Sequence, residues 1–141
     1  KTGCDWLLLG GRADVSLTEQ LTAEISAKAP SARVTNLAGQ TTLRELCAAL
    51  KACQLVLTND TGPMHVAAAL GTPVVVPFGS TSPELTGPAF MDKSPHQIVP
   101  GAAACAPCFL RDCPIDFRCM KSISVEQMVE AAGNVRFSLR S

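Results

Sequence analysis

One short segment of this chain combines the residue types that bind an anion at the start of a helix. Its sequence is Asn-Asp-Thr-Gly-Pro-Met-His, residues 59–65, between an apolar run at 55–57 and an alanine-rich run at 66–70. When a helix follows a strand and a polar turn, its first backbone N–H groups lack partners, and its dipole favours negative charge there. Gly62 lets a ligand approach the backbone, and Pro63 suits the first helical turn because it has no N–H group.

The same segment also has a structural interpretation, in which Asp60 or Thr61 only caps the helix and His65 lies on its surface. The sequence that follows favours binding. A second apolar run at 74–78 leads into a second polar turn, Gly-Ser-Thr-Ser-Pro, at 79–83. Two strands joined by a short helix form a βαβ unit, so both turns lie at the carboxyl edge of a parallel sheet, where ligands bind in such folds.

Strand and helix patterns alternate along the rest of the chain. Strands are expected at 6–9, 33–37, 55–57, 74–78 and 97–99. Helices are expected after capping boxes at Ser16–Glu19 and Thr42–Glu45, after the turn at 59–65, and after Ser124. Their apolar faces are expected at residues 17, 21 and 25, at 43, 46, 47 and 50, and at 125, 128, 129 and 132. This alternation predicts an α/β, Rossmann-like parallel sheet with helices on both faces, and no linker divides the chain.

Composition narrows the class of protein. The 141 residues are 47% hydrophobic and 17% charged, with a formal net charge of zero, which is typical of one compact domain. Neutrality and few aromatic side chains argue against binding nucleic acid. No apolar run reaches the roughly 20 residues of a transmembrane helix, so no membrane span is expected. The chain begins with Lys and shows no secretory signal, so we expect an excised domain or a fragment.

Seven cysteines are many for this length, and four of them lie between positions 105 and 119. An odd number without a secretory signal favours a reducing compartment, so a cytoplasmic protein is expected. Cys105, Cys108, Cys113 and Cys119 can supply four thiolates to a structural zinc ion. The last spacing is loose for zinc, however, and no His lies in the cluster. Reduced thiols that pack a loop, or one or two disulfides, remain the alternative.

Three segments together resemble a known family: residues 60–65, 67–73 and 78–83. They are similar to the C-terminal half of the lipopolysaccharide heptosyltransferases, glycosyltransferase family 9, and most similar to the ADP-heptose:LPS heptosyltransferase II type. Residues 7–14, residues 36–43 and the cysteine-rich tail also fit, so the resemblance covers nearly the whole chain. The family has the GT-B fold, two Rossmann-like domains that face a cleft. The resemblance implies that residues 1–141 are the C-terminal nucleotide-sugar-binding domain, without the N-terminal acceptor domain.

This resemblance also implies substrates and site residues. The donor is ADP-heptose or a related nucleotide sugar, and the acceptor is the lipid A–core region, reached through the absent domain. The enzyme is then cytoplasmic, with peripheral contact at the inner membrane face as a further expectation. The donor-binding residues are the turn Asp60, Thr61, Gly62, Pro63, Met64 and His65, the turn Gly39, Gln40 and Thr41, and the glycines Gly10 and Gly11.

Their expected roles differ. The backbone amides of Thr61, Gly62 and Met64 cradle the diphosphate, with His65 near the phosphates, and Asp60 accepts hydrogen bonds from sugar hydroxyls. The turn at 39–41 lies against the adenine or ribose, and Gly10 and Gly11 line the same cleft. No cofactor is required. The catalytic base is expected on the absent domain, so this chain alone is expected to be inactive.

Asp60 as the catalytic base is a rival role, but a carboxylate beside a helix N-terminus has a lowered proton affinity, which suits binding better. Three other functions stay open on the sequence alone. The first is a stand-alone module that binds a nucleotide or other diphosphate. The second is a GT-B transferase domain for another nucleotide sugar, and the third is a zinc-stabilised interaction domain.

Overall fold

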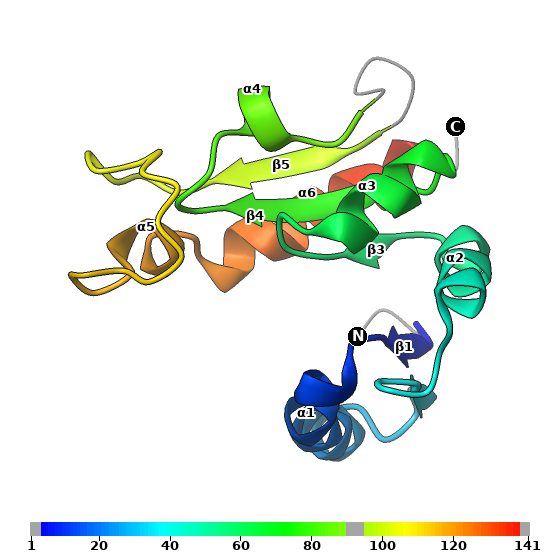
Figure 1. The fold of residues 1–141 in the computed structure, drawn as a ribbon. Helices are drawn as coiled ribbons and strands as arrows, with labels where there is room; N and C mark the ends of the chain where they lie inside the picture. The colour runs from blue at the N-terminus through cyan, green and yellow to red at the C-terminus, as the bar shows by residue number, and fades with distance from the viewer. Residues whose placement is uncertain (1–3, 90–94, 139–141) are drawn as a thin grey trace. The chain divides into compact units, whose positions relative to one another are not determined.

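The computed structural model describes residues 4–89 and 95–138 of the chain. The chain separates into two compact units, Lys1–Leu46 and Cys47–Ser141, and both combine helices with parallel strands (Figure 1). The predicted α/β class is therefore confirmed. The strands hydrogen-bond in two parallel sheets, β1–β2 and β3–β4–β5, where one sheet was expected.

The first unit contains two of the predicted strands and the first helix. Strand β1 (Trp6–Leu8) pairs in parallel with β2 (Val34–Asn36), and the connection contains η1 (Arg12–Asp14) and α1 (Val15–Lys28). The capping box predicted at Ser16–Glu19 is wrong, because the N-cap of α1 is Asp14, two residues before Ser16, and the helix begins at Val15. The carboxylate of Asp14 instead accepts a hydrogen bond from the Gly11 amide at 2.8 Å.

The apolar face predicted for α1 is also wrong in its details. Leu17 is 57% exposed and Leu21 is 39% exposed, whereas the polar Thr18 is buried. The hydroxyl of Thr18 donates to the carbonyl of Val15 and accepts a hydrogen bond from the side-chain amide of Asn36 in β2. A satisfied polar contact therefore joins α1 to β2, and hydrophobic periodicity has no signal for such a contact.

Helix α2 (Leu43–Ala52) crosses the boundary between the two units, and its predicted start is confirmed. The amide of Thr42 donates to the Glu45 carboxylate, and the amide of Glu45 donates to the Thr42 hydroxyl, which is the reciprocal pair of a capping box. Leu50 of this helix is 1% exposed, as predicted for its apolar face, but Leu43, predicted for the same face, is 72% exposed because it is the first residue of the helix.

The second unit contains the three-stranded sheet. Strands β3 (Val56–Leu57), β4 (Val74–Phe78) and β5 (Gln97–Pro100) run in parallel in the order β3–β4–β5. Because the strands are parallel, the turns that follow them gather at one edge of the sheet. The remaining elements of this unit are α3 (Gly62–Ala69), α4 (Pro83–Thr86), α5 (Arg118–Lys121) and α6 (Val125–Ser138).

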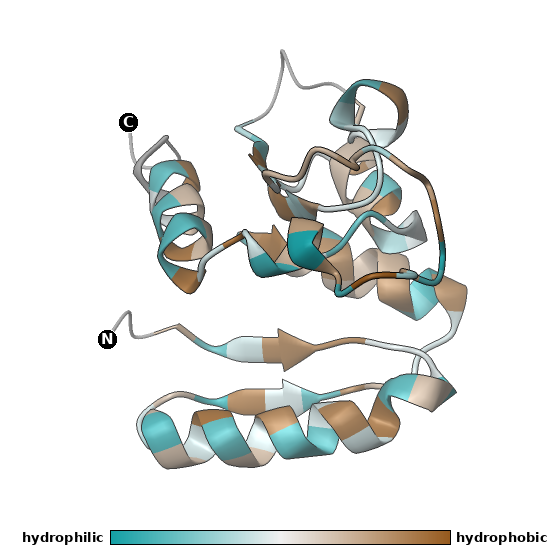
Figure 2. Ribbon diagram, turned by 90° about the vertical axis from the view of Figure 1, so that its left-hand side faces the viewer, coloured by the Kyte–Doolittle hydropathy of each residue, from teal (hydrophilic) through white to brown (hydrophobic). Residues whose placement is uncertain are grey.

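Helices α3 and α6 lie on opposite sides of this sheet, as the views in Figures 1 and 2 agree. Val74, Val75 and Val76 of β4 are fully buried. Val75 packs with Val99, Ala131 and Val135 on the side of α6. Since side chains alternate along a strand, Val74 and Val76 face the other side, that of α3.

The C-terminal helix begins as predicted, and half of its predicted apolar face, Met128 and Ala132, packs against the core. Ser124 and Gln127 form a capping pair, in which the Ser124 hydroxyl accepts from the Gln127 amide and the Gln127 side chain accepts from the Ser124 amide. Val125 and Val129, predicted to be buried, are 73% and 66% exposed. The core residues of α6 are Ala131 and Val135, with Met128 and Ala132 packed against them. The helix is therefore rotated from the predicted orientation, so that Ala131 and Val135 contact the sheet in place of Val125 and Val129.

Candidate functional site

The strand–turn–helix predicted around residues 59–65 is present in the second unit. Strand β3 ends at Leu57 and α3 begins at Gly62, with Pro63 in its first turn. Thr61 is the N-cap residue, but no side chain caps the helix, because the Thr61 hydroxyl donates to the carbonyl of Asn59 instead. The interpretation of Asp60 or Thr61 as a side-chain cap therefore does not match the geometry.

The start of α3 has backbone N–H groups that no residue satisfies. Thr61 and Gly62 are exposed, and over residues 4–89 and 95–138 neither of their amides donates a hydrogen bond. The Met64 amide differs from the prediction, since it donates to the Thr61 carbonyl at 3.0 Å. A side chain placed on Gly62 would meet no heavy atom within 4 Å, so the space before these amides is open. Two free amides at an open helix start have the geometry that suits an anion.

Asp60 lies immediately before these amides and is half-buried. Its Oδ2 atom accepts a hydrogen bond of 2.7 Å from the hydroxyl of Thr86, at the end of α4. That contact fixes the carboxylate and connects the first turn to α4, the helix that follows the second turn. His65 is exposed on the first turns of α3, and its imidazole has no hydrogen bond to the part of the chain that the structure describes. It is therefore free to contact a bound anion.

The other predicted donor contacts lie in the first unit. The Gly39 amide donates to the carbonyl of Gly10 at 2.9 Å, and Gly39 has φ +70°, which favours glycine. A Cβ atom on Gly10 would lie 2.8 Å from the Cβ of Asp14. The amide of Gly11 is already satisfied by the Asp14 carboxylate. Local packing thus accounts for glycine at positions 10 and 39, and the Gly11 amide is occupied within the unit.

Gln40 and Thr41 also belong to the first unit. The Gln40 side chain donates to the carbonyl of Asn36 at 3.3 Å, and the backbone amide of Gln40 donates to the carbonyl of Leu37. Thr41 is half-buried. Contacts of these residues and of the glycines with a nucleotide remain a prediction.

The cysteine segment, residues 101–121, is fixed to the second turn by its backbone. The carbonyl of Ser80 accepts hydrogen bonds from the amides of Cys108 and Phe109, at 3.0 and 2.8 Å. The amide of Gly101 donates to the carbonyl of Phe78. Ser80 and Thr86 therefore hold the turns in place, and neither was singled out from the sequence, because a carbonyl acceptor and a single hydroxyl leave no pattern.

The four clustered cysteines differ in environment. Cys105 and Cys108 are exposed, Cys113 is half-buried and Cys119 is buried. In the described parts of the chain no three or more cysteine, histidine or acidic side chains are grouped so that they can hold a metal ion. The geometry thus gives no support to the proposed zinc site, which remains a prediction.

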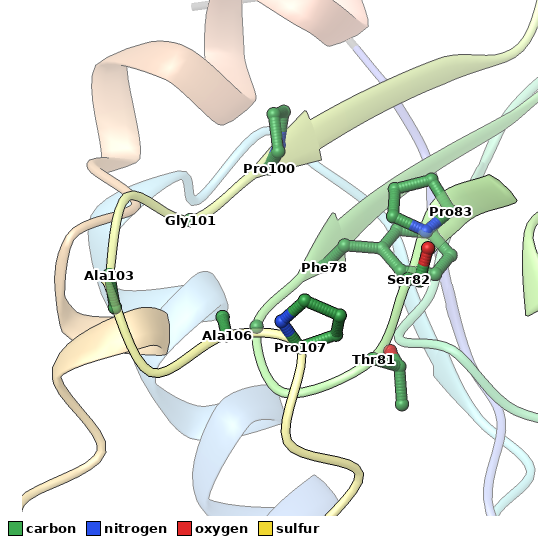
Figure 3. Close-up of a pocket in the computed structure, with 10 residues that line it drawn as sticks. Phe78, Thr81, Ser82, Pro83, Pro100, Gly101, Ala103, Ala106 and Pro107 are labelled. Carbon is green, nitrogen blue, oxygen red and sulfur yellow. The ribbon is translucent and has the colours of Figure 1, made fainter.

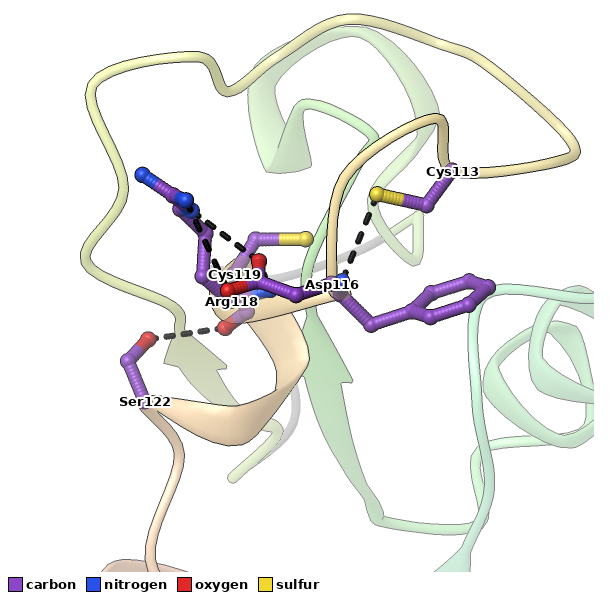
Figure 4. A network of polar contacts seen from close by, with 6 residues as sticks. Cys113, Asp116, Arg118, Cys119 and Ser122 are labelled. Atoms are coloured by element: carbon purple, nitrogen blue, oxygen red, sulfur yellow. Dashed lines mark hydrogen bonds and ion pairs between the residues drawn. The ribbon is translucent and has the colours of Figure 1, made fainter.

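Cys113 has a distinct role within this segment (Figure 4). Its Sγ atom accepts a hydrogen bond from the amide of Phe117 at 3.3 Å. Hydrogen bonds from the amides of Ile115 and Phe117 lower the pKa of the Cys113 thiol. The neighbouring Asp116 carboxylate accepts from the Arg118 guanidinium at 3.0 Å, and this hydrogen bond lowers the pKa of Asp116. The Cys113 sulfur thus helps to fix the turn that leads into α5.

A parallel sheet with an open, anion-binding helix start at its carboxyl edge is typical of a nucleotide-binding α/β domain. Comparison with known proteins gives the particular family. The sequence profile of glycosyltransferase family 9 (heptosyltransferase) matches residues 1–117. The chain belongs to this family, as predicted.

Relatives with assigned names include the lipooligosaccharide heptosyltransferase 2 of Campylobacter jejuni, which is 33% identical over 133 residues, 93% of this chain. The lipopolysaccharide heptosyltransferase 2 of Escherichia coli is 37% identical over 86 residues, 61% of this chain. The chain spans only 40% and 24% of the lengths of these two relatives.

Solved structures agree with the fold. The structure of E. coli ADP-heptose LPS heptosyltransferase II superposes with a TM-score of 0.78 at 24% identity, over 97% of this chain and 38% of that one. A glycosyltransferase family 9 protein from Veillonella parvula gives a TM-score of 0.77 at 23% identity, over 95% and 37%. The α/β fold is thus that of part of a GT-B heptosyltransferase. Over the residues that the structure describes, no helix is long and apolar enough to cross a bilayer.

Proposed function

We propose that this chain is the C-terminal, donor-binding domain of a glycosyltransferase that moves heptose from ADP-heptose to the lipopolysaccharide inner core. The observation that carries the proposal is the pair of unsatisfied amides, of Thr61 and Gly62, at the exposed start of α3. These amides bind the donor diphosphate, which gains negative charge as the sugar leaves. Donors placed where charge develops stabilise a transition state strongly.

Asp60 has the position expected of a group that accepts hydrogen bonds from the donor sugar. It is adjacent to the free amides, and its Oδ2 is already held by Thr86. A carboxylate beside a diphosphate is repelled by it, so a nearby sugar hydroxyl is the partner that best accounts for this residue. The base that deprotonates the acceptor hydroxyl then lies on the N-terminal acceptor domain of the enzyme.

The partners follow from the same assignment. The acceptor, a lipid A–core saccharide, binds through the other domain, and we place the reaction on the cytoplasmic side, at the inner membrane face. The odd number of cysteines is in keeping with a reducing compartment. A different nucleotide sugar is the alternative donor, and binding of a panel of such donors distinguishes the two.

Substitution of Gly62 tests the proposal. In Gly62→Asp the helix dipole stabilises the new carboxylate. The new side chain meets no atom within 4 Å at its Cβ, so the fold is retained. The same carboxylate repels a diphosphate from the amides. Calorimetry on the 141-residue chain should show ADP binding to the wild type and a loss of at least tenfold in Gly62→Asp. The neutral Gly62→Asn, of similar size, should lose less. Equal ADP affinity in Gly62→Asp and wild type would refute the proposed site.

A further inference from the structure

A cavity of about 160 Å³ opens at the carboxyl ends of β4 and β5, in the second unit (Figure 3). Phe78 and Pro100, the last residues of these strands, form part of its lining. One wall is the turn 79–83, and the opposite wall comes from residues 101–107 of the cysteine segment. Figure 3 shows Ala106 and Pro107 across from Ser82 and Pro83.

The two walls are joined by backbone hydrogen bonds, so the cavity does not depend on a ligand to form. Gly101 donates to Phe78 at 2.8 Å, on the side of the strands. Cys108 and Phe109 donate to the carbonyl of Ser80, just beyond the residues that line the cavity. The cysteine segment thus forms one wall of the cavity through its backbone, independently of its thiols.

The lining is uncharged and combines apolar rings with free hydroxyls. None of the ten residues around the cavity carries a charged side chain, which argues against a phosphate or a metal ion as occupant. Phe78, Pro83 and Pro107 present apolar rings. The hydroxyls of Thr81 and Ser82 have no hydrogen-bond partner in the described parts of the chain, so both can pair with a ligand. A neutral ring with apolar C–H faces and hydroxyl groups matches this lining.

The cavity is next to the proposed diphosphate site. Ser82 and Pro83 are in its wall and begin α4, and Thr86 at the end of α4 donates to Asp60. The four residues of α4 rise by only about 6 Å along the helix axis. A ligand whose diphosphate lies at the start of α3 therefore has the cavity within reach of its next chemical group, past Asp60.

We propose that this cavity holds the sugar ring of the nucleotide-sugar donor, and this inference rests on the proposed function. Its volume lies below the roughly 300–1,000 Å³ of sites that enclose a drug-sized ligand, so it accommodates one ring and not the nucleotide. The apolar rings pack against the sugar face, and Thr81 and Ser82 bond its hydroxyls. Selection for the donor sugar then resides in the turn 79–83 and the cysteine segment.

A variant that fills the cavity tests the assignment on the 141-residue chain. Ala103 lines the cavity, whereas the neighbouring Ala104 is exposed and does not, so Ala104→Leu is the matched control for Ala103→Leu. Calorimetry with ADP and with ADP-heptose gives the ratio of their affinities. We expect the wild type and Ala104→Leu to prefer ADP-heptose, and Ala103→Leu to bind both ligands with the ADP affinity, a ratio near one.

A second variant guards against a local change of fold in the first. Thr81→Val keeps the side-chain shape and removes the hydroxyl, so the preference for ADP-heptose should fall about two- to tenfold with ADP affinity unchanged. If ADP binds but Ala103→Leu keeps the wild-type preference, or loses ADP as well, the cavity does not hold the sugar. If the wild type binds neither ligand, the proposed function itself fails.

Discussion

Asp60 is the residue whose role the structure sharpens most. Its carboxylate does not cap α3, and it is held by the Thr86 hydroxyl beside two amides that attract an anion. The carboxylate repels an anion and the amides attract one. Both can contact the same ligand if the ligand has a charged group at the amides and a neutral group at the carboxylate. A diphosphate followed by a sugar has that character.

Asp60→Asn should therefore separate the two parts of the donor. The substitution removes the negative charge and keeps the shape, so ADP should bind equally or more tightly. ADP-heptose should bind more weakly by about 1.5–3 kcal/mol, the value of a hydrogen bond to a charged group. Thr86→Val is the control, because it loses the contact to Asp60 but keeps the carboxylate. Equal losses for both ligands in calorimetry would show that Asp60 contacts only the nucleotide part.

His96 is a second residue with a measurable signature, in this case of stability. It is 4% exposed, its Nδ1 accepts a hydrogen bond from the Val74 amide, and its Nε2 has no partner in the described residues. Burial lowers the pKa of His96 below its ordinary value of 6.5. Below that value the unfolded chain binds a proton that the folded chain resists, so the free energy of unfolding falls as the pH falls.

The expected result is full stability above about pH 6.5 and a loss below it, of at most about 1.4 kcal/mol per pH unit from this group. Denaturant unfolding between pH 5 and 8 measures the slope. His96→Leu should lower stability at every pH by about 1–3 kcal/mol, because the Val74 amide loses its acceptor, and should flatten the curve. The exposed His65, the other histidine of the chain, is the control. A wild-type slope in His96→Leu would contradict this account.

At the scale of elements, the sequence predicted all five strands found in residues 4–89 and 95–138, and polar capping patterns predicted two helix starts. The turn at 59–65 was predicted because glycine, proline and acidic residues follow an apolar run in a fixed order. The apolar face of α6 was predicted in part: Met128 and Ala132 pack against the core, but Val125 and Val129 are exposed, and Ala131 and Val135 were not predicted. The contacts of Ser80 and Thr86 were missed as well, since tertiary hydrogen bonds depend on partners far apart in sequence.

The cysteine segment, as an element, should contribute to stability through Cys119. Cys119 is 6% exposed and lies near Gly79, where a Cβ atom would be 3.4 Å from its sulfur. Cys119→Ser buries a hydroxyl in place of sulfur and should lower the melting temperature, whereas Cys108→Ser, at an exposed site, should have little effect. A large effect of Cys108→Ser together with destabilisation by a chelator would instead show that zinc binds here.

At the scale of the whole molecule, the two units and the family relation set a limit on activity. The relatives are more than twice as long as these 141 residues, and the proposal assigns the base and the acceptor site to an N-terminal domain outside them. Positioning two substrates supplies much of the rate of a transfer reaction. The 141-residue chain should bind donor but transfer no heptose to a lipid A–core acceptor, as measured by release of ADP. Turnover by the chain alone would contradict the assignment of the base and the acceptor site to the N-terminal domain.

The most direct test of the central claim is a titration of the isotope-labelled chain with ADP, followed by amide NMR. We predict that the largest shifts fall on the amides of Thr61 and Gly62, with smaller shifts at Met64, whose amide is already bonded within the turn. His65 should shift as well. A set of shifts confined to the cysteine segment, or the absence of any shift at the start of α3, would contradict the claim that this helix end binds the donor diphosphate.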